Sequence, residues 1–151
     1  MDVLLTAPRV VESIVDGKYV NKTVSRILSQ RFKFKKPLEE IEYLYAYGNS
    51  HEDTNVDDNV YVGITNYRIF KLDQGEQSQV FRKDVISVKY VEGGIFRFDK
   101  ILLELQDADV TIGIYESSSC KFFCSYLSVT PFDDPLVKLE KKWKEAKESS
   151  N

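Results

Sequence analysis

The sequence is poor in the residue types that most catalytic and metal sites use. Its 151 residues include one histidine, His51, and two cysteines, Cys120 and Cys124. Two cysteines are too few for the disulfide framework of a small secreted domain. Zinc sites usually need a second pair of ligands, and none accompanies these cysteines, so we expect two buried, structural thiols and no metal. A lone loop histidine is expected to be solvated, not catalytic.

Long apolar runs are also lacking. No stretch approaches the roughly 18 residues that a membrane-spanning helix needs. The N-terminus, MDVLLTAPRVVESIVDG, contains Asp2 and lacks the basic start and long apolar segment of a secretory signal. We therefore expect a cytoplasmic protein, with peripheral membrane association left open.

Material for a folded core is present, because 42% of the residues are apolar and 13% are aromatic. The formal net charge of −3 gives no general signal for nucleic acid. The charge is unevenly distributed: residues 17–38 carry seven basic and no acidic side chains, whereas residues 39–59 carry seven acidic and no basic ones. The two blocks predict a local dipole.

Residues 6–36 are predicted to be helical. Thr6 is a suitable cap for a first helix that ends at Gly17. Apolar residues within 20–32 recur at helical spacing and predict a second helix, which Pro37 terminates.

From residue 39 the apolar pattern has a period of two, and turn residues separate short segments. Short links exclude parallel crossovers, so we predict an antiparallel meander. The seven predicted strands are residues 40–47, 59–65, 67–72, 79–82, 85–91, 98–105 and 109–115.

Two helices are predicted after the strands. The first begins at Ser117–Ser119, which are good capping residues, and its Phe123 and Leu127 are expected to plug the end of the strand assembly. The second begins at Asp134, with Pro135 at its first position. Its apolar stripe consists of Leu136, Leu139, Trp143 and Ala146.

The segment VYVGITNYRIFKLD changes phase at Thr65-Asn66-Tyr67-Arg68. Such a slip predicts a tight turn or a bulge, and Asn66 could adopt positive φ there. An ordinary hairpin in any antiparallel sheet would satisfy the pattern.

The same segment resembles a signature of the pleckstrin-homology (PH) superfold. It is most similar to GRAM domains and bacterial PH-like domains, and the similarity covers about residues 37–129. The resemblance implies an α+β, mainly β fold: a seven-stranded antiparallel PH-like barrel or sandwich capped by a helix. Residues 1–36 would form an N-terminal helical arm and residues 130–151 a C-terminal amphipathic helix. Tyr67 and Arg68 would then be structural.

The sequence does not predict an enzyme or a cofactor. Asp53-Thr54-Asn55-Val56-Asp57 begins like a calcium loop, but Asp58 replaces the required glycine and Ile64 the required glutamate. No glycine-rich phosphate loop or nucleophile–base pair is evident.

We therefore expect a binding module that acts through protein contacts, as an adaptor or a subunit of a larger assembly. Leu139 and Trp143 are the predicted interaction residues, because tryptophan is favoured at interfaces. Packing of their helix onto the domain is the alternative.

The second hypothesis is a peripheral module that binds anionic lipid or phosphoinositide. Many PH domains bind lipid phosphates near the first hairpin. Here that loop, NSHEDTNVDDN, is acidic, so we do not expect this chain to have the lipid pocket of those domains. The segment RFKFKK would serve instead, since basic residues beside Phe32 and Phe34 suit an anionic interface. Its predicted lipid-binding residues are Arg31, Lys33, Lys35 and Lys36. In the alternative, both phenylalanines enter the core. Nucleic acid binding is not expected.

Overall fold

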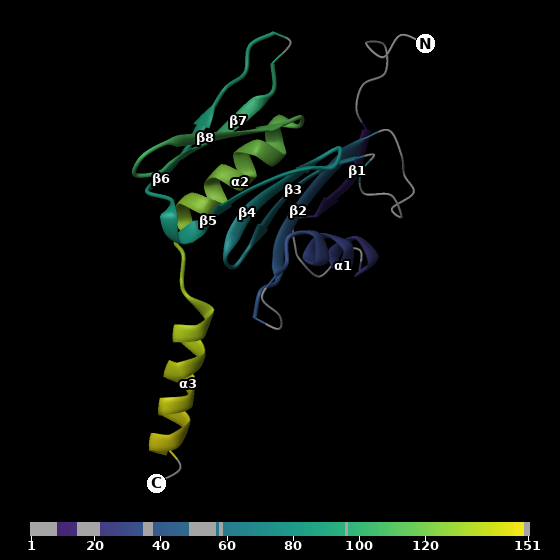
Figure 1. Cartoon of the computed structure of the whole chain (residues 1–151). Coiled ribbons are helices and arrows are strands. Elements are labelled where there is room, and N and C mark those ends of the chain that lie inside the picture. Colours follow the sequence, from purple (N-terminus) through teal and green to yellow (C-terminus); the bar gives the residue numbers. More distant parts are fainter. Residues whose placement is uncertain are drawn as a thin grey trace.

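The computed structural model describes residues 9–14, 22–34, 38–48, 57, 59–95 and 97–149. Within these residues the protein is α+β, with two antiparallel sheets and three α-helices (Figure 1). The five-stranded sheet has the order β1-β2-β3-β4-β5, and the three-stranded sheet has the order β6-β7-β8.

The strands are β1 (Arg9–Ile14), β2 (Ile41–Gly48), β3 (Asn59–Thr65), β4 (Arg68–Asp73), β5 (Glu76–Phe81), β6 (Ser87–Val91), β7 (Asp99–Glu104) and β8 (Asp109–Ile114). The helices are α1 (Lys22–Arg31), α2 (Ser117–Val129) and α3 (Pro135–Ser149), and a short 3₁₀ turn, η4 (Arg82–Asp84), joins β5 to β6.

The prediction of a helix near the N-terminus is wrong for residues 9–14. They form β1, which pairs antiparallel with β2 and shifts register between Val10 and Glu12. The valines and Ile14 of this segment have a spacing that also fits a helix, but β-branched residues favour strands, and β2 offers a free edge. Thr6 and Gly17, the predicted ends of that helix, lie outside the described residues.

The two sheets do not close into the barrel that the resemblance implied. No hydrogen-bonded strand pair joins them in the described part of the chain, and η4 carries the chain from one sheet to the other. The described strands number eight, because β1 adds to the seven predicted ones. Six of those seven lie within two residues of their predicted ends, while β5 begins at Glu76, three residues early.

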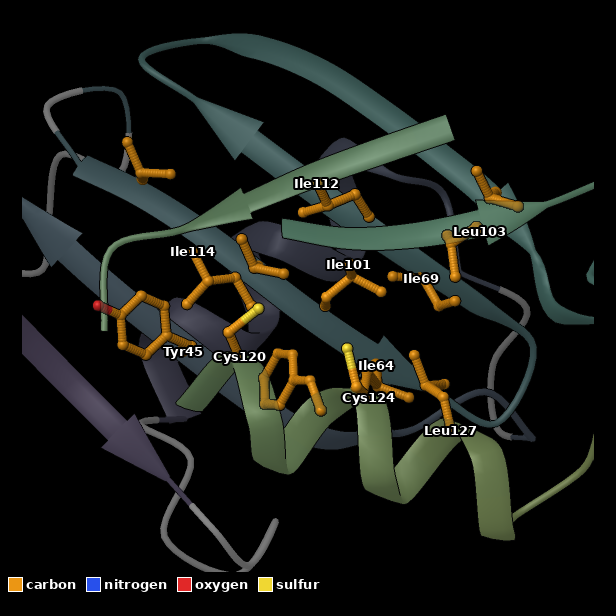
Figure 2. Close-up of a cluster of buried hydrophobic side chains, with 14 of the residues drawn as sticks. Tyr45, Ile64, Ile69, Ile101, Leu103, Ile112, Ile114, Cys120, Cys124 and Leu127 are labelled. Carbon is orange, nitrogen blue, oxygen red and sulfur yellow. The ribbon is translucent and has the colours of Figure 1, made fainter. Parts of the chain in front are cut away.

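An inner core lies between the two sheets and α2 (Figure 2). Isoleucine and leucine side chains of both sheets meet one face of α2 there, and Phe123 and Leu127 are buried as predicted. The helix begins at Ser117, but its N-cap residue is Glu116, whose carboxylate accepts hydrogen bonds from the hydroxyls of Ser118 and Ser119. Because α2 supplies the third wall, the sheets do not need to close on each other.

An outer core covers the opposite face of the five-stranded sheet. Val24, Leu28 and Phe32 of the α1 region pack there with residues of β2, β3 and β4. Every residue of β3 is consequently buried, as expected for a strand covered on both faces. Gly63 is required in this strand, because an added Cβ would lie 2.1 Å from the ring of Phe70.

The turn between β3 and β4 is built from side-chain hydrogen bonds. The Thr65 hydroxyl oxygen accepts the backbone N–H groups of Tyr67 and Arg68 at 3.0 and 2.9 Å. Asn66 does not adopt the positive φ that was predicted, since Lys33 and Gln74 are the only described non-glycine residues that do. Its amide instead accepts the N–H of Glu40 and donates to the carbonyl of Leu38.

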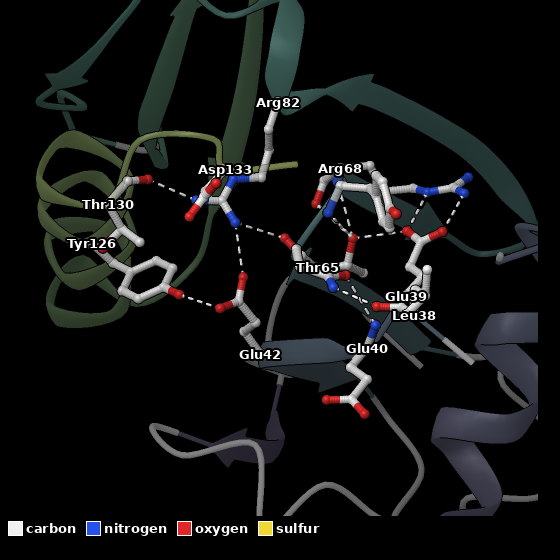
Figure 3. Close-up of polar contacts among 12 residues, drawn as sticks. Leu38, Glu39, Glu40, Glu42, Thr65, Arg68, Arg82, Tyr126, Thr130 and Asp133 are labelled. Carbon is white, nitrogen blue, oxygen red and sulfur yellow. Dashed lines mark hydrogen bonds and ion pairs between the residues drawn. The ribbon is translucent and has the colours of Figure 1, made fainter. Parts of the chain in front are cut away.

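Arg68 is buried and connects four parts of the fold (Figure 3). Its Nε and Nη2 donate to the two carboxylate oxygens of Glu39 at 2.7 and 2.6 Å. Its Nη1 donates to the carbonyl of Phe32, just past α1, and to the side chain of Gln79 in β5. Both charged side chains are almost inaccessible to solvent, at 4% and 0%. Arg68 is therefore structural, as the resemblance implied.

Breaking this pair from one side should be strongly destabilising. We expect Arg68→Met or Glu39→Leu alone to lower the free energy of unfolding by about 3–5 kcal/mol, because each leaves one buried charge without its partner. The double variant should lose less than the sum of the two single losses. Urea denaturation of the four proteins measures this, and a double variant that loses the full sum would contradict the coupling.

Candidate interaction surfaces

Helix α3 extends away from the rest of the molecule (Figure 1). It contains no buried residue, and the predicted interaction residues Leu139 and Trp143 are 42% and 70% exposed. The predicted start is confirmed: the Asp134 carboxylate accepts the Leu136 N–H at 2.9 Å, and Pro135 occupies the first position. Its apolar residues therefore face solvent.

A cleft of about 520 Å³ lies at the foot of α3. It is bounded by the chain from Arg82 to Val88 on one side and by the end of α2 with residues 130–132 on the other. Ile69 and Leu127 contribute apolar surface inside it. On the same lining, Ile86 is 70% exposed.

Arg82 fixes the wall of this cleft and the foot of α3 (Figure 3). Its Nη2 donates to the Thr130 carbonyl at 2.7 Å, and its Nη1 donates to the Glu42 carboxylate at 2.8 Å and to the Thr65 carbonyl. The Tyr126 hydroxyl donates to the other oxygen of Glu42 at 2.6 Å. Burial is the main cause that raises the pKa of Tyr126, and the hydrogen bond to Glu42 raises it further. The end of α2 is thereby tied to β2.

Neither Arg82 nor Glu42 was identified from the sequence. The two residues are forty positions apart, and each looks like an ordinary surface charge in its own strand pattern. The exposure of Ile86 was not evident from the sequence either, because in the alternating pattern of residues 85–91 it shares a side with the apolar Val88 and Tyr90.

The basic segment is divided between core and surface. Phe32 is buried, and Phe34 packs against it and Phe70 in the outer core, as the alternative reading of the sequence expected. Arg31 forms an ion pair with Asp57 at 2.8 Å, and this hydrogen bond lowers the pKa of Asp57. Lys33 is exposed. The other two predicted lipid-binding residues, Lys35 and Lys36, lie outside the described residues.

A polar pocket of about 290 Å³ adjoins this segment. Arg31 and Lys33 contribute positive charge, and Gln77, Ser78 and Gln79 of β5 contribute hydrogen-bonding groups. Gln77 also donates to the Arg31 carbonyl at the end of α1. The pocket can therefore accept a small anionic or polar group.

The link between β6 and β7 displays exposed apolar side chains that were not predicted from the sequence. Ile95 is 85% exposed and Phe98 is 38% exposed. Gly93 is needed here, because an added Cβ would lie 2.4 Å from the Arg97 carbonyl oxygen. The Gly93 N–H donates to the Asp99 carboxylate at 2.8 Å, and the Tyr90 hydroxyl donates to the same carboxylate. The link is thus held at its base.

Among the residues that the structure describes, the candidate reactive groups do not form a metal-binding cluster. Cys120 and Cys124 are buried free thiols on α2, as predicted, and the hydrogen bond with Cys124 and burial raise the pKa of Cys120. In the described part of the chain, no three side chains of metal-binding type gather closely enough to hold an ion. His51 and residues 53–56 and 58 of the calcium-like stretch lie outside it.

The chain matches no known family and no curated protein. Its two antiparallel sheets and following helix are compatible with a PH-like sandwich. None of the helices that the structure describes has both the length and the apolar composition needed to cross a membrane.

The Asp99 carboxylate gives the fold a testable pH dependence. Hydrogen bonds from Ser117, Tyr90 and Gly93, in that order of importance, lower the pKa of Asp99 to about 2. An unfolded aspartate has a pKa of about 3.9, so the ionised group stabilises the fold above that pH and this stabilisation is lost as the pH falls toward 2.

We therefore expect Asp99→Asn to lower the urea midpoint at about pH 6, and the difference from the parent protein to shrink by about pH 2. Asp107→Asn, at an exposed turn, is the matched control and should change the midpoint little. A difference that is constant across this pH range would contradict the role of the carboxylate charge.

Proposed function

We propose that this chain is a non-catalytic, PH-like binding module that acts through protein contacts, as an adaptor or a subunit of a larger assembly. The observation that carries the proposal is α3, an amphipathic helix whose Leu139 and Trp143 are exposed. Leucine and tryptophan side chains stabilise a complex by about 1.5–3 kcal/mol each when they become buried.

The order of the strands supports membership in the PH superfold, with the GRAM and bacterial PH-like domains as the nearest types. Strands β2 to β5, then β6 to β8, then α2 follow the order that the resemblance implies for residues 37–129. In this proposal β1 and α1 are additions that complete the body of the module. Residues 130–151, which include α3, are its binding extension, and the protein is cytoplasmic.

The cleft supports a binding role more than a catalytic one. The polar side chains on its described lining belong to Arg82, Lys83, Ser87, Ser128 and Thr130. None of these is a carboxylate, histidine or thiol that could act as a general base at neutral pH. The apolar surface and exposed Ile86 suit the side chains of a protein partner, for which the cleft would extend the contact made by α3.

Co-purification with the native chain tests the proposal. We expect a specific partner to be retained by the parent protein, and Trp143→Ala to weaken its binding about 30-fold or more, corresponding to about 2 kcal/mol for an interface hot spot. Val137→Ala is the matched control, since Val137 is exposed on the same helix but outside the stripe. Equal retention by all three proteins would show that α3 is not the binding surface.

A second candidate function is peripheral binding to anionic lipid, favoured by the pocket that Arg31 and Lys33 line. Co-sedimentation with phosphoinositide-containing vesicles tests it. Lys33→Gln should reduce binding about fivefold, because one basic residue near an anionic surface contributes about 1 kcal/mol. Lys100→Gln, an exposed change on β7, should have no such effect. The lipid function would be ruled out if the protein bound phosphatidylcholine vesicles as well as phosphoinositide-containing ones, or if binding did not weaken with salt.

A further inference from the structure

The apolar stripe of α3 has the spacing of a coiled-coil seam. Its members, at positions 136, 139, 143 and 146, follow each other at intervals of three, four and three residues. At about 100° per residue they span an arc of only about 80°. A helix that lies in a membrane surface needs a wider apolar face, so this narrow stripe fits a protein seam or groove better than a bilayer.

The charges beside the stripe disfavour pairing of α3 with itself. Lys142 borders one side, and Glu140 and Lys147 border the other. In a parallel pair, Lys142 of one copy would face Lys147 of the other. In an antiparallel pair that aligns Leu136 with Ala146, Lys142 would approach Lys142 and Glu140 would approach Glu140. Like charges therefore meet in both orientations.

We propose that α3 docks against a different protein, on an apolar seam or groove bordered by acidic side chains. This inference rests on the proposed function and specifies its partner. The helix contains five lysines and three glutamates, so its net charge favours an acidic partner. Lys142 would face the acidic border directly, while Leu139 and Trp143 fill the seam. The cleft at the foot of α3 provides adjoining apolar surface for the same partner.

Trp143 is the only tryptophan in the chain, so its fluorescence reports on the stripe without a label. The probes are two tryptophan-free peptides of about three heptads, both with leucine at the seam positions, one flanked by glutamates and the other by lysines. With the full-length chain, we expect the acidic peptide to shift the Trp143 emission to the blue and to bind at least about tenfold more tightly than the basic one.

Charge reversal at one lysine sharpens the test. Lys142→Glu should weaken binding of the acidic peptide about tenfold, while Lys141→Glu, the same change on the opposite face of α3, should leave it nearly unchanged. Equal effects of both variants, or equal binding of the two peptides, would overturn the inference.

Two further outcomes would also overturn it. One is an equal blue shift with phosphatidylserine vesicles, and the other is self-association in sedimentation that Trp143→Ala abolishes. The inference can fail in these ways while Trp143→Ala still releases the co-purified partner. In that case the partner is not an acidic seam or groove, but the proposed protein-binding function stands. If that partner is retained, the proposed function itself fails.

Discussion

The buried guanidinium of Arg68 is the constraint around which the layers of this protein are arranged. Removing a charged group from water is costly unless its donors are satisfied, and Arg68 meets this requirement with partners from separate parts of the chain. Glu39 lies just before β2, Phe32 just after α1, and Gln79 in β5. Any displacement of α1 from the sheet would remove a hydrogen bond from a buried cation. The Arg68 network thus fixes the position of α1, and with it the outer core.

The period-two pattern was enough to predict most of the sheets, because each strand contributes a face to a core. It failed at β1, where β-branched residues at positions 10, 11 and 14 satisfy either a helix or an edge strand. The choice depends on the free edge of β2, whose residues lie 30 or more positions farther along the chain. It also failed to predict how the β3–β4 turn is built. Asn66 was a reasonable residue for positive φ, but its amide serves a segment that precedes it by 26 residues or more. Long-range partners of this kind leave no local signal.

The difference between local patterns and long-range contacts also applies to the surfaces. The stripe that contains Leu139 and Trp143 is local, so its spacing alone predicted a helix with an apolar face. Whether that face would pack back onto the domain could not be predicted. The two amphipathic segments differ in this respect: α1 is buried against the sheet, whereas α3 is not.

The basic segment contains side chains that could have been exposed but pack into the outer core. Its phenylalanines looked suitable for a membrane, but Phe70 and Arg68 form a place for them in the outer core. No local sequence pattern predicted the cleft, because its two sides, η4 and the end of α2, are far apart in the sequence and come together only in the folded protein.

Two buried arginines hold the chain next to α1 and next to α3, but the two helices face different surroundings. Arg68 holds a carbonyl just after α1, and the helix it secures faces a continuous apolar sheet surface. Arg82 holds the carbonyl of Thr130, between α2 and α3, but its other partners, Glu42 and the Thr65 carbonyl, lie at the edge of the inner core, which α2 already fills. A third helix is therefore not needed to complete the inner core. The chain beyond Thr130 starts from a fixed point and turns outward, which reduces the conformational entropy that α3 would lose on meeting a partner. Exposure of Trp143 thus follows from how the core is filled.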